Sequence, residues 1–316
     1  MKILHVGDIS FVGSMLCREM RRRKLAAAVL SKAGGPLRDL KDPWIVYRKN
    51  FMDELNLCGI DPQEYDVIHA HYLINWGSLG LRLKNIKRPI LLHAHGADLF
   101  PSTPLHRFIQ RAVAAQSKFM LYSTPDLLKA LTWFKGRTIY LPNPVEIPEL
   151  PEADRPFGKR ILIYGTLYRF KKIETLFPRI EQLPYQFDLI DFGPDSEYTR
   201  RRLPKNAVMI APFPKSQVNK ELIKYKLVLG GSQDGSIRMC ELEAMALGIP
   251  TLFPFRYNDF YKEPLPMPGD WLKDIGKYVG DRSLGQQQRQ WVERYHRVEV
   301  VVDQLLQIYE RVKNKA

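Results

Sequence analysis

The stretch Ser236–Pro250, SIRMCELEAMALGIP, is the most informative part of this chain. A short apolar strand candidate, Leu227–Leu229, runs into the glycine-rich bend 230–236, and a helix follows the bend. The first N–H groups of a helix have no partner within it and carry the positive end of its dipole, so this helix start can bind an anion. Glu243, inside the helix, can accept hydrogen bonds from hydroxyl groups. An anion site beside a hydroxyl acceptor indicates a nucleotide-type ligand.

Composition indicates an ordinary globular protein with room for two domains. The chain has 316 residues, of which 45% are hydrophobic and 26% charged. It has no apolar run of 18 residues, and its start, MKILHVGDIS, predicts a first strand rather than a signal peptide, so a cytoplasmic location is expected. Cys17, Cys58 and Cys240 stand apart, without metal-ligand spacing, so we expect buried thiols and no metal site.

The net charge is +14, and the densest basic cluster is Arg18–Lys24 on the expected first helix. Such a cluster is typical of contacts with nucleic acid, anionic lipid or a polyanionic substrate, but also of a solvated helix end. The chain has no recognisable nucleic-acid module, so nucleic acid is not an expected partner. An anionic membrane surface stays open as a partner, which would make the protein peripheral on the cytoplasmic face of a membrane.

Strand and helix patterns alternate from end to end, which predicts an α/β protein with parallel sheets covered by helices on both faces. The proline-rich segment 142–156 divides the chain into two Rossmann-like, doubly wound domains, residues 1–148 and 149–316. The expected strands are Ile3–Val6, Ala27–Leu30, Val67–Ala70, Ile90–Ala94, Phe119–Tyr122, Thr138–Leu141, Ile161–Tyr164, Phe187–Ile190, Val208–Ala211, Leu227–Leu229 and Thr251–Phe253. The expected helices include Leu105–Ala115, Ile173–Gln182, Val218–Tyr225 and Glu241–Leu247.

The last segment, Gln287–Lys315, has apolar residues at helical spacing. We expect one or two amphipathic helices there, used for packing rather than for membrane contact. They could pack back on the N-terminal domain.

Six motifs occur in the order found in the retaining, two-domain glycosyltransferases of family 4, which have the GT-B architecture. The motifs, listed from the N-terminus, are YDVIHAHY (65–72), LLHAHGADLF (91–100), YLPNPVE (140–146), ILIYGTLYRFKK (161–172), DLIDFGPDSEY (188–198) and ELEAMALGIP (241–250). Each is weak alone, but together they span nearly the whole chain. The sequence therefore resembles this family.

The resemblance implies two Rossmann-like domains that face each other across a cleft, with acceptor binding in residues 1–148 and nucleotide-sugar binding in 149–316. It implies transfer of a hexose-type sugar from a nucleoside-diphosphate sugar, such as a UDP- or GDP-sugar, with retention of anomeric configuration. The acceptor would be a saccharide or a polyprenyl- or dolichyl-linked saccharide. No cofactor or metal is implied.

The same resemblance assigns roles to individual residues. Glu243 would accept from the ribose hydroxyls, and the backbone from Ile237 through Arg238 and Met239 to Cys240 would bind the diphosphate. Lys171 would neutralise the leaving diphosphate. His95 would lie near the reacting sugar. Asp98 and Asn143 would support the site.

Three positions depart from the family pattern. Gly235 stands where a first glutamate usually contacts the donor sugar, and its neighbours Asp234 and Ser236 are candidate substitutes. The usual diphosphate-binding arginine is replaced by Thr166, and Arg169 is the candidate substitute. The glycines of the first loop are reduced to Gly13, which is still expected to bind donor. These departures put the donor sugar in doubt.

Simpler interpretations stay open for the same residues. His95 could be a satisfied core histidine, as we expect for His69 and His71, and Lys171 could be a solvated helix start. The chain could also be another GT-B sugar-nucleotide enzyme, or a degenerate relative that only binds. Glu243 is harder to explain in this way, because carboxylates are seldom buried without a partner.

Overall fold

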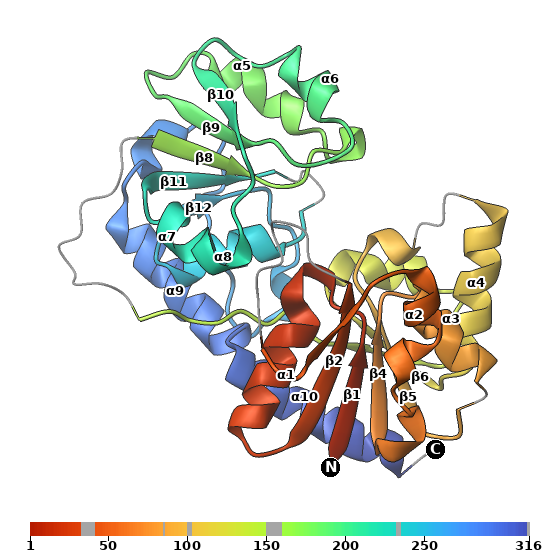
Figure 1. The fold of residues 1–316 in the computed structure, drawn as a ribbon. Coiled ribbons are helices and arrows are strands. Elements are labelled where there is room, and N and C mark those ends of the chain that lie inside the picture. The colour runs from red at the N-terminus through yellow and green to blue at the C-terminus, as the bar shows by residue number, and fades with distance from the viewer. Residues whose placement is uncertain (33–41, 85, 100–102, 150–159, 232–234, 315–316) are drawn as a thin grey trace. The chain divides into compact units, whose positions relative to one another are not determined.

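A computed structural model of the chain describes residues 1–32, 42–84, 86–99, 103–149, 160–231 and 235–314. It divides into two compact units, drawn in Figure 1. Unit 1 comprises Met1–Pro144 and Val298–Ala316, and unit 2 comprises Val145–Arg297. The chain therefore leaves unit 1 at residue 144, somewhat before the expected division at 148, and returns to it for its last helix.

Unit 1 is built on a seven-stranded parallel sheet in the order β3-β2-β1-β4-β5-β6-β7. Its strands are β1 (Lys2–Val6), β2 (Ala26–Lys32), β3 (Ile45–Arg48), β4 (Val67–His71), β5 (Ile90–Ala94), β6 (Phe119–Tyr122) and β7 (Arg137–Tyr140). Its helices are α1 (Val12–Arg22), α2 (Phe51–Leu55), α3 (Trp76–Leu83), α4 (Pro104–Ala114) and α10 (Val298–Lys313).

Helices cover the unit 1 sheet on both faces. One core joins strand residues such as Leu4, Ile68 and Leu92 to Leu81 of α3 and Val113 of α4. Alternate strand residues point to the opposite face, where α1 and α10 pack together and α10 contacts β5. This second face carries His69, whose ring bonds to Tyr309 of α10.

Unit 2 is built on a five-stranded parallel sheet in the order β10-β9-β8-β11-β12. Its strands are β8 (Arg160–Tyr164), β9 (Phe187–Ile190), β10 (Ala207–Ile210), β11 (Tyr225–Gly230) and β12 (Thr251–Leu252). Its helices are α5 (Phe177–Ile180), α6 (Ser196–Arg200), α7 (Val218–Leu222), α8 (Met239–Ala246) and α9 (Arg282–Tyr295). Residues of α7 and α8 pack on one sheet face, and residues of α5 and α9 pack on the other.

The predicted fold class is confirmed, since all eleven expected strands are present in two parallel sheets. The sequence missed β3, an edge strand in which three of four residues are only half-buried, so that it has no continuous apolar run. The helix expected to reach Tyr225 was wrong at its end, because α7 stops at Leu222 and Tyr225 begins β11. The helix expected from Ile173 starts as a 3₁₀ turn, and α5 proper begins beside Pro178.

Candidate functional site

The start of α8 lies at the carboxyl end of the unit 2 sheet, after β11 (Figure 1). Ser236 and Ile237 are almost fully buried, and Ile237 packs into the core beside α8. Burial of these two side chains fixes the backbone that leads into the helix. The first helical N–H groups, at Met239 and Cys240, have no acceptor within the helix and therefore point outward from it. This edge has the geometry of an anion site.

Glu243 is 8% exposed in α8, and two residues hold its carboxylate. Lys215 Nζ lies 2.6 Å from Oε1, and the Tyr164 hydroxyl donates to Oε2 over 2.9 Å. A carboxylate offers about four lone-pair sites, so hydroxyl groups of a ligand can still bind. Sequence reasoning missed both partners. Tyr164 is the last residue of a predicted strand, and this position could have indicated that it lies near the site. Lys215 follows β10 and belongs to no recognisable motif.

Glu241 has a different role from Glu243. Its Oε2 accepts the backbone N–H of Arg238 over 2.9 Å, and therefore caps the start of α8. The side chain is 1% exposed, and burial raises the pKa of this carboxyl. Glu241 therefore stabilises the helix start and is not available to a ligand in the way Glu243 is.

Lys171 lies in a 3₁₀ turn, Arg169–Lys171, that follows β8. Burial raises the pKa of Cys240 and of Glu241, and the positive charge of Lys171 opposes that rise in both groups. Strand β8 pairs in parallel with β11, so the turn that carries Lys171 and the α8 start lie at the same end of the unit 2 sheet. Lys171 is also half-buried, which disfavours the interpretation as a merely solvated helix start.

Arg169 contacts Tyr198 and Asp195. Its guanidinium lies over the Tyr198 ring, 4.1 Å from the centroid, and its Nε is 3.4 Å from a carboxylate oxygen of Asp195. The side chain is 65% exposed. Its assignment to the diphosphate stays a prediction.

Gly235 occupies a position that suits glycine for two reasons. Its φ is +86°, a left-handed conformation that side chains disfavour. A Cβ there would lie 2.8 Å from Arg256 Cγ and 2.9 Å from the Pro254 carbonyl oxygen. A glutamate at this position would therefore be strained. Asp234, one candidate to replace it, lies outside the described residues, and Ser236 is buried.

In unit 1, the loop that follows β5 carries His95 and Asp98. The buried Asp98 carboxylate accepts the backbone N–H groups of Leu73, His95 and Gly96 over 2.9–3.0 Å. Burial raises the pKa of Asp98 to about 6, against these donors, which lower it. Gly96 has φ +123°. Asp98 thus holds the loop after β4 against the loop after β5 and so positions His95.

The other two unit 1 candidates are buried. Gly13 lies in the first turn of α1, where a Cβ would meet the Gly7 carbonyl oxygen at 2.9 Å. Asn143 is 7% exposed after β7. Both lie in unit 1, whereas the Glu243 and Lys171 candidates lie in unit 2.

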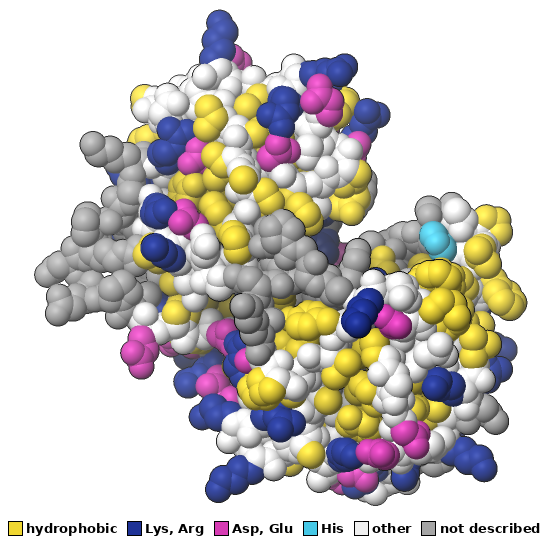
Figure 2. Space-filling view, viewed as in Figure 1, with side chains coloured by type: hydrophobic (Ala, Val, Ile, Leu, Met, Phe, Trp, Pro, Cys, Tyr) yellow, Lys and Arg dark blue, Asp and Glu magenta, His cyan; other side chains and the backbone are white. Residues whose placement is uncertain are grey.

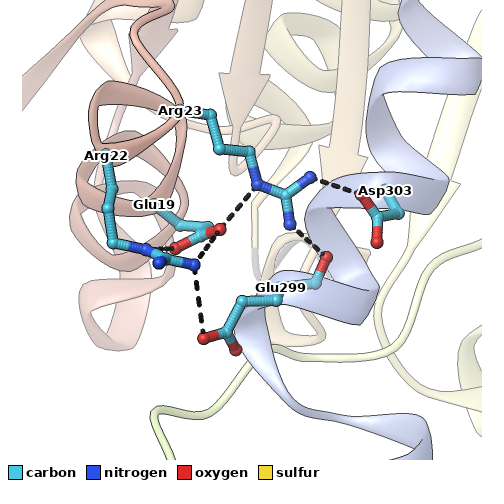
Figure 3. Close-up of polar contacts among 5 residues, drawn as sticks. All are labelled: Glu19, Arg22, Arg23, Glu299 and Asp303. Atoms are coloured by element: carbon cyan, nitrogen blue, oxygen red, sulfur yellow. Dashed lines mark hydrogen bonds and ion pairs between the residues drawn. The ribbon is translucent and has the colours of Figure 1, made fainter.

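Arg22 and Arg23 of the basic cluster Arg18–Lys24 are paired within unit 1 (Figure 3). Arg22 and Arg23 each place Nε 2.6 Å from the Glu19 carboxylate, and they also reach Glu299 and Asp303 of α10. Burial by itself would raise the pKa of Glu19. The hydrogen bonds from Arg22 and Arg23 outweigh burial, so the pKa lies below its usual range. These arginines join α1 to α10, so part of the cluster's charge is paired within unit 1, while Arg21, Arg22 and Lys24 stay exposed.

Comparison with known proteins defines the fold class. No protein-family model and no curated protein matches the chain. Solved structures match it over its whole length. Sucrose-phosphate synthase of Thermosynechococcus elongatus is 16% identical with a TM-score of 0.72, covering 100% of both chains. Anabaena HepE, solved with UDP and glucose, is 14% identical with a TM-score of 0.70, covering 98% of this chain and 100% of that one.

A third structure, AviGT4, a glycosyltransferase involved in avilamycin A biosynthesis, is 14% identical with a TM-score of 0.65, covering 100% of this chain and 99% of its own. At such identities the likeness establishes the fold. The chain has a GT-B-like fold of two parallel α/β sheets.

Proposed function

We propose that this chain is a retaining glycosyltransferase of family 4 type. It transfers a hexose-type sugar from a nucleoside-diphosphate sugar, a UDP- or GDP-sugar, to a saccharide or lipid-linked acceptor. One observation carries the proposal: at one sheet edge of unit 2, the α8 start, Lys171 and the buried carboxylate of Glu243 come together. The α8 start and Lys171 suit a diphosphate, and the Glu243 carboxylate suits the hydroxyl groups of a ribose.

The donor would bind unit 2 through its nucleoside diphosphate. The outward N–H groups at Met239 and Cys240 would bind phosphate oxygens, and Lys171 would neutralise charge that grows on the leaving diphosphate. Glu243, oriented by Lys215 and Tyr164, would accept from the ribose hydroxyls. We keep Arg169 as a further diphosphate ligand and Gly13 as the donor contact from unit 1.

The reaction would proceed by attack on the same face from which the nucleotide leaves. The bond between the anomeric carbon and the phosphate oxygen breaks, and the acceptor oxygen forms a bond to that carbon. The leaving phosphate takes the proton of the acceptor hydroxyl, so no side-chain nucleophile is required. His95 would hydrogen-bond the reacting sugar, with Asp98 holding its loop.

Glu243→Gln is expected to weaken UDP or GDP binding about 10- to 100-fold, because a charge-assisted hydrogen bond contributes roughly 1.5–3 kcal/mol. Calorimetric titration with each nucleotide measures this. The exposed Glu197, also in unit 2, is the matched control, and Glu197→Gln should bind normally. Unchanged nucleotide affinity in Glu243→Gln would contradict the ribose assignment.

Glu243→Gln also leaves the half-buried Lys215 without its charged partner. The double variant Glu243→Gln/Lys215→Met removes both charges and separates a folding defect from a binding defect. A screen of UDP- and GDP-sugars for nucleotide release tests the transferase activity itself. Nucleotide binding without turnover across donors and acceptors would favour a degenerate relative that only binds.

We propose that a lipid-linked acceptor is met at an anionic membrane surface, through α3 and α4 rather than α1. Leu83, Leu105 and Phe108 are 63–69% exposed there, and Arg107 and Arg111 are exposed beside them. Between Asp66 and Asp126 the sequence holds one acidic residue, the buried Asp98, so the surface is apolar and basic. Figure 2 shows hydrophobic side chains gathered over α2, α3 and α4. No helix of the described residues is long and apolar enough to cross a bilayer.

The variant Leu105→Ser/Phe108→Ser is expected to lower partitioning onto anionic vesicles at least about tenfold, because apolar burial contributes roughly 25 cal/mol per Å². Co-sedimentation with phosphatidylglycerol and with phosphatidylcholine vesicles measures it. Phe192 of unit 2 is 47% exposed, and Phe192→Ser is the control. Equal partitioning of wild type onto both vesicles at low salt would refute the docking surface.

A further inference from the structure

Five of the chain's seven histidines form one cluster, the histidine array, on a single face of the unit 1 sheet. His5 lies on β1, His69 and His71 on β4, and His93 and His95 at the end of β5. Strand register sets His5 beside His69 and His71 beside His93, and residues two apart share a face. Four members are fully buried, and His95 is the partly exposed one.

Hydrogen bonds order the array into two chains. In the outer chain, His95 Nε2 lies 3.0 Å from His71 Nδ1, and His71 Nε2 lies 2.9 Å from His5 Nδ1. In the inner chain, His93 Nδ1 lies 3.2 Å from His69 Nε2, and His69 Nδ1 lies 2.8 Å from the Tyr309 hydroxyl. The outer chain therefore runs from the partly exposed ring to the buried Nε2 of His5, which has no hydrogen-bond partner in the described part of the chain.

The rings are held neutral. Burial lowers the pKa of His5 and of His95 to about 3, and it lowers the pKa of the other three well below the usual range. The outer chain therefore has no ring at which an extra proton could rest near neutral pH.

Each neutral ring carries one proton on one of its two nitrogens. In the outer chain, the choice of nitrogen in one ring therefore fixes the choice in the other two. His71 uses both nitrogens, so it must donate through one and accept through the other. If Nδ1 of His71 carries the proton, His5 must be protonated at Nδ1 and His95 must accept at Nε2, which puts its own proton on Nδ1. If Nε2 of His71 carries it, all three rings are protonated at Nε2. Any mixed state loses a hydrogen bond in the interior.

We propose that His71 and His5 are positioning residues that hold His95 in a tautomer shared along the outer chain, so that His95 presents Nδ1 to the substrate in a defined state. The inference rests on the proposed function, in which His95 meets the reacting sugar. The two uniform arrangements differ at the buried Nε2 of His5, where either an N–H or a lone pair is left unpaired. The interior therefore selects the state of the exposed nitrogen.

The ring geometry favours this role over a metal site. Two trios, His5–His69–His71 and His71–His93–His95, hold nitrogens within 4.8 Å of one another. However, His69 stacks on His71 with centroids 4.1 Å apart and planes inclined by 25°, and the rings of His93 and His95 lie at the same centroid distance with a tilt of 35°. Stacked rings point their lone pairs along separate planes, whereas metal ligands must aim them at one point.

Long-range ¹H–¹⁵N correlation spectra of the ligand-free protein, labelled with ¹⁵N only in histidine, read each ring's tautomer. The expected result at pH 7 is three neutral rings, His5, His71 and His95, protonated at the same nitrogen. In His71→Leu, His95 should become a mixture of tautomers. Different tautomers within the outer chain, a charged ring, or a metal ion retained after chelation would each overturn the proposal.

A kinetic measurement tests the positioning role. His71→Leu is expected to lower kcat about three- to tenfold, the effect of one hydrogen bond, without changing UDP affinity. His106, half-buried on α4, is the control, and His106→Asn should retain full kcat with a soluble saccharide acceptor, which does not use the proposed membrane surface of α3 and α4. An unchanged kcat in His71→Leu would overturn the positioning role. A protein without transferase activity that still shows the shared tautomer would count against the proposed function alone, so the two failures are distinguishable.

Discussion

Lowering the pH from 8 to 5.5 is expected to remove about 6 kcal/mol from the stability of unit 1. The five buried rings of the histidine array have folded-state pKa values far below 6.5, so the folded protein stays unprotonated where the unfolded chain takes up protons. Stability is therefore complete above pH 6.5 and is lost as the pH falls from 6.5 towards 3. Each ring costs roughly 1.4 kcal/mol at pH 5.5, or about 7 kcal/mol for five.

Asp98 opposes this loss. Its pKa is raised to about 6, so the folded state takes up a proton below pH 6 that the unfolded state takes up only near 4. This protonation stabilises the folded state by about 1 kcal/mol at pH 5.5. The remaining 6 kcal/mol is comparable with the whole stability of a typical domain, about 5–15 kcal/mol, so unit 1 should unfold between about pH 6 and 5.

Urea unfolding at each pH, monitored by hydrogen exchange, measures the effect. Peptides from β4 and β5 report the unfolding of unit 1, and peptides from β8 and β9 of unit 2 are the internal reference. The expected slope of the unfolding free energy between pH 6 and 5 corresponds to about three to four protons taken up on unfolding, because the proton on folded Asp98 offsets part of the uptake by the five rings. His5→Leu should reduce that count by one, whatever it does to absolute stability. A slope of one proton or fewer would show that the array is not held neutral.

Lys171→Met is expected to lower kcat about 100- to 1,000-fold. A preorganised charge at the developing negative charge of a leaving group contributes roughly 2.7–4 kcal/mol to the barrier. Lys171 fits this role because its charge acts on Cys240 and Glu241 at the α8 start, where the diphosphate would bind. Initial rates of nucleotide release at saturating donor measure the loss.

Lys172 supplies a matched control, because it carries the same charge one residue along and is exposed. Its φ is +53°, a conformation that asparagine tolerates, so Lys172→Asn removes the charge without new strain. This variant should stay within about threefold of wild type, the effect expected of an exposed charge. Equal losses in the two variants would indicate a general field effect and would refute a specific role for Lys171.

Much of the fold could be predicted from local patterns. The alternation of apolar strands and helices identified both parallel sheets, because a strand buried on both faces is a short continuous apolar run. The glycine-rich bend indicated that a helix follows it, which was expected over Glu241–Leu247 and is observed over Met239–Ala246. The edge strand β3 escaped because half-buried residues leave no such run.

The candidate site was predictable in outline only. Glu243 could be selected because an isolated carboxylate on an apolar helix needs a partner, but its partner Lys215 lies 28 residues away, on another loop. The pairing of the Arg18–Lys24 cluster could not be predicted for the same reason. Its partner Asp303 is 280 residues from Arg23, and no local pattern indicates that α10 returns to α1.

The sequence by itself determined the order of elements, the glycine-rich bend before α8, and the placement of histidines two residues apart on one strand face. The tertiary structure alone decided that these pairs meet: the register of β1, β4 and β5 sets His5, His71 and His95 in one hydrogen-bonded line. Periodicity and turn chemistry act over a few residues and are written locally in the chain. Which side chains then meet depends on sheet order and register, which are set by packing of the whole unit.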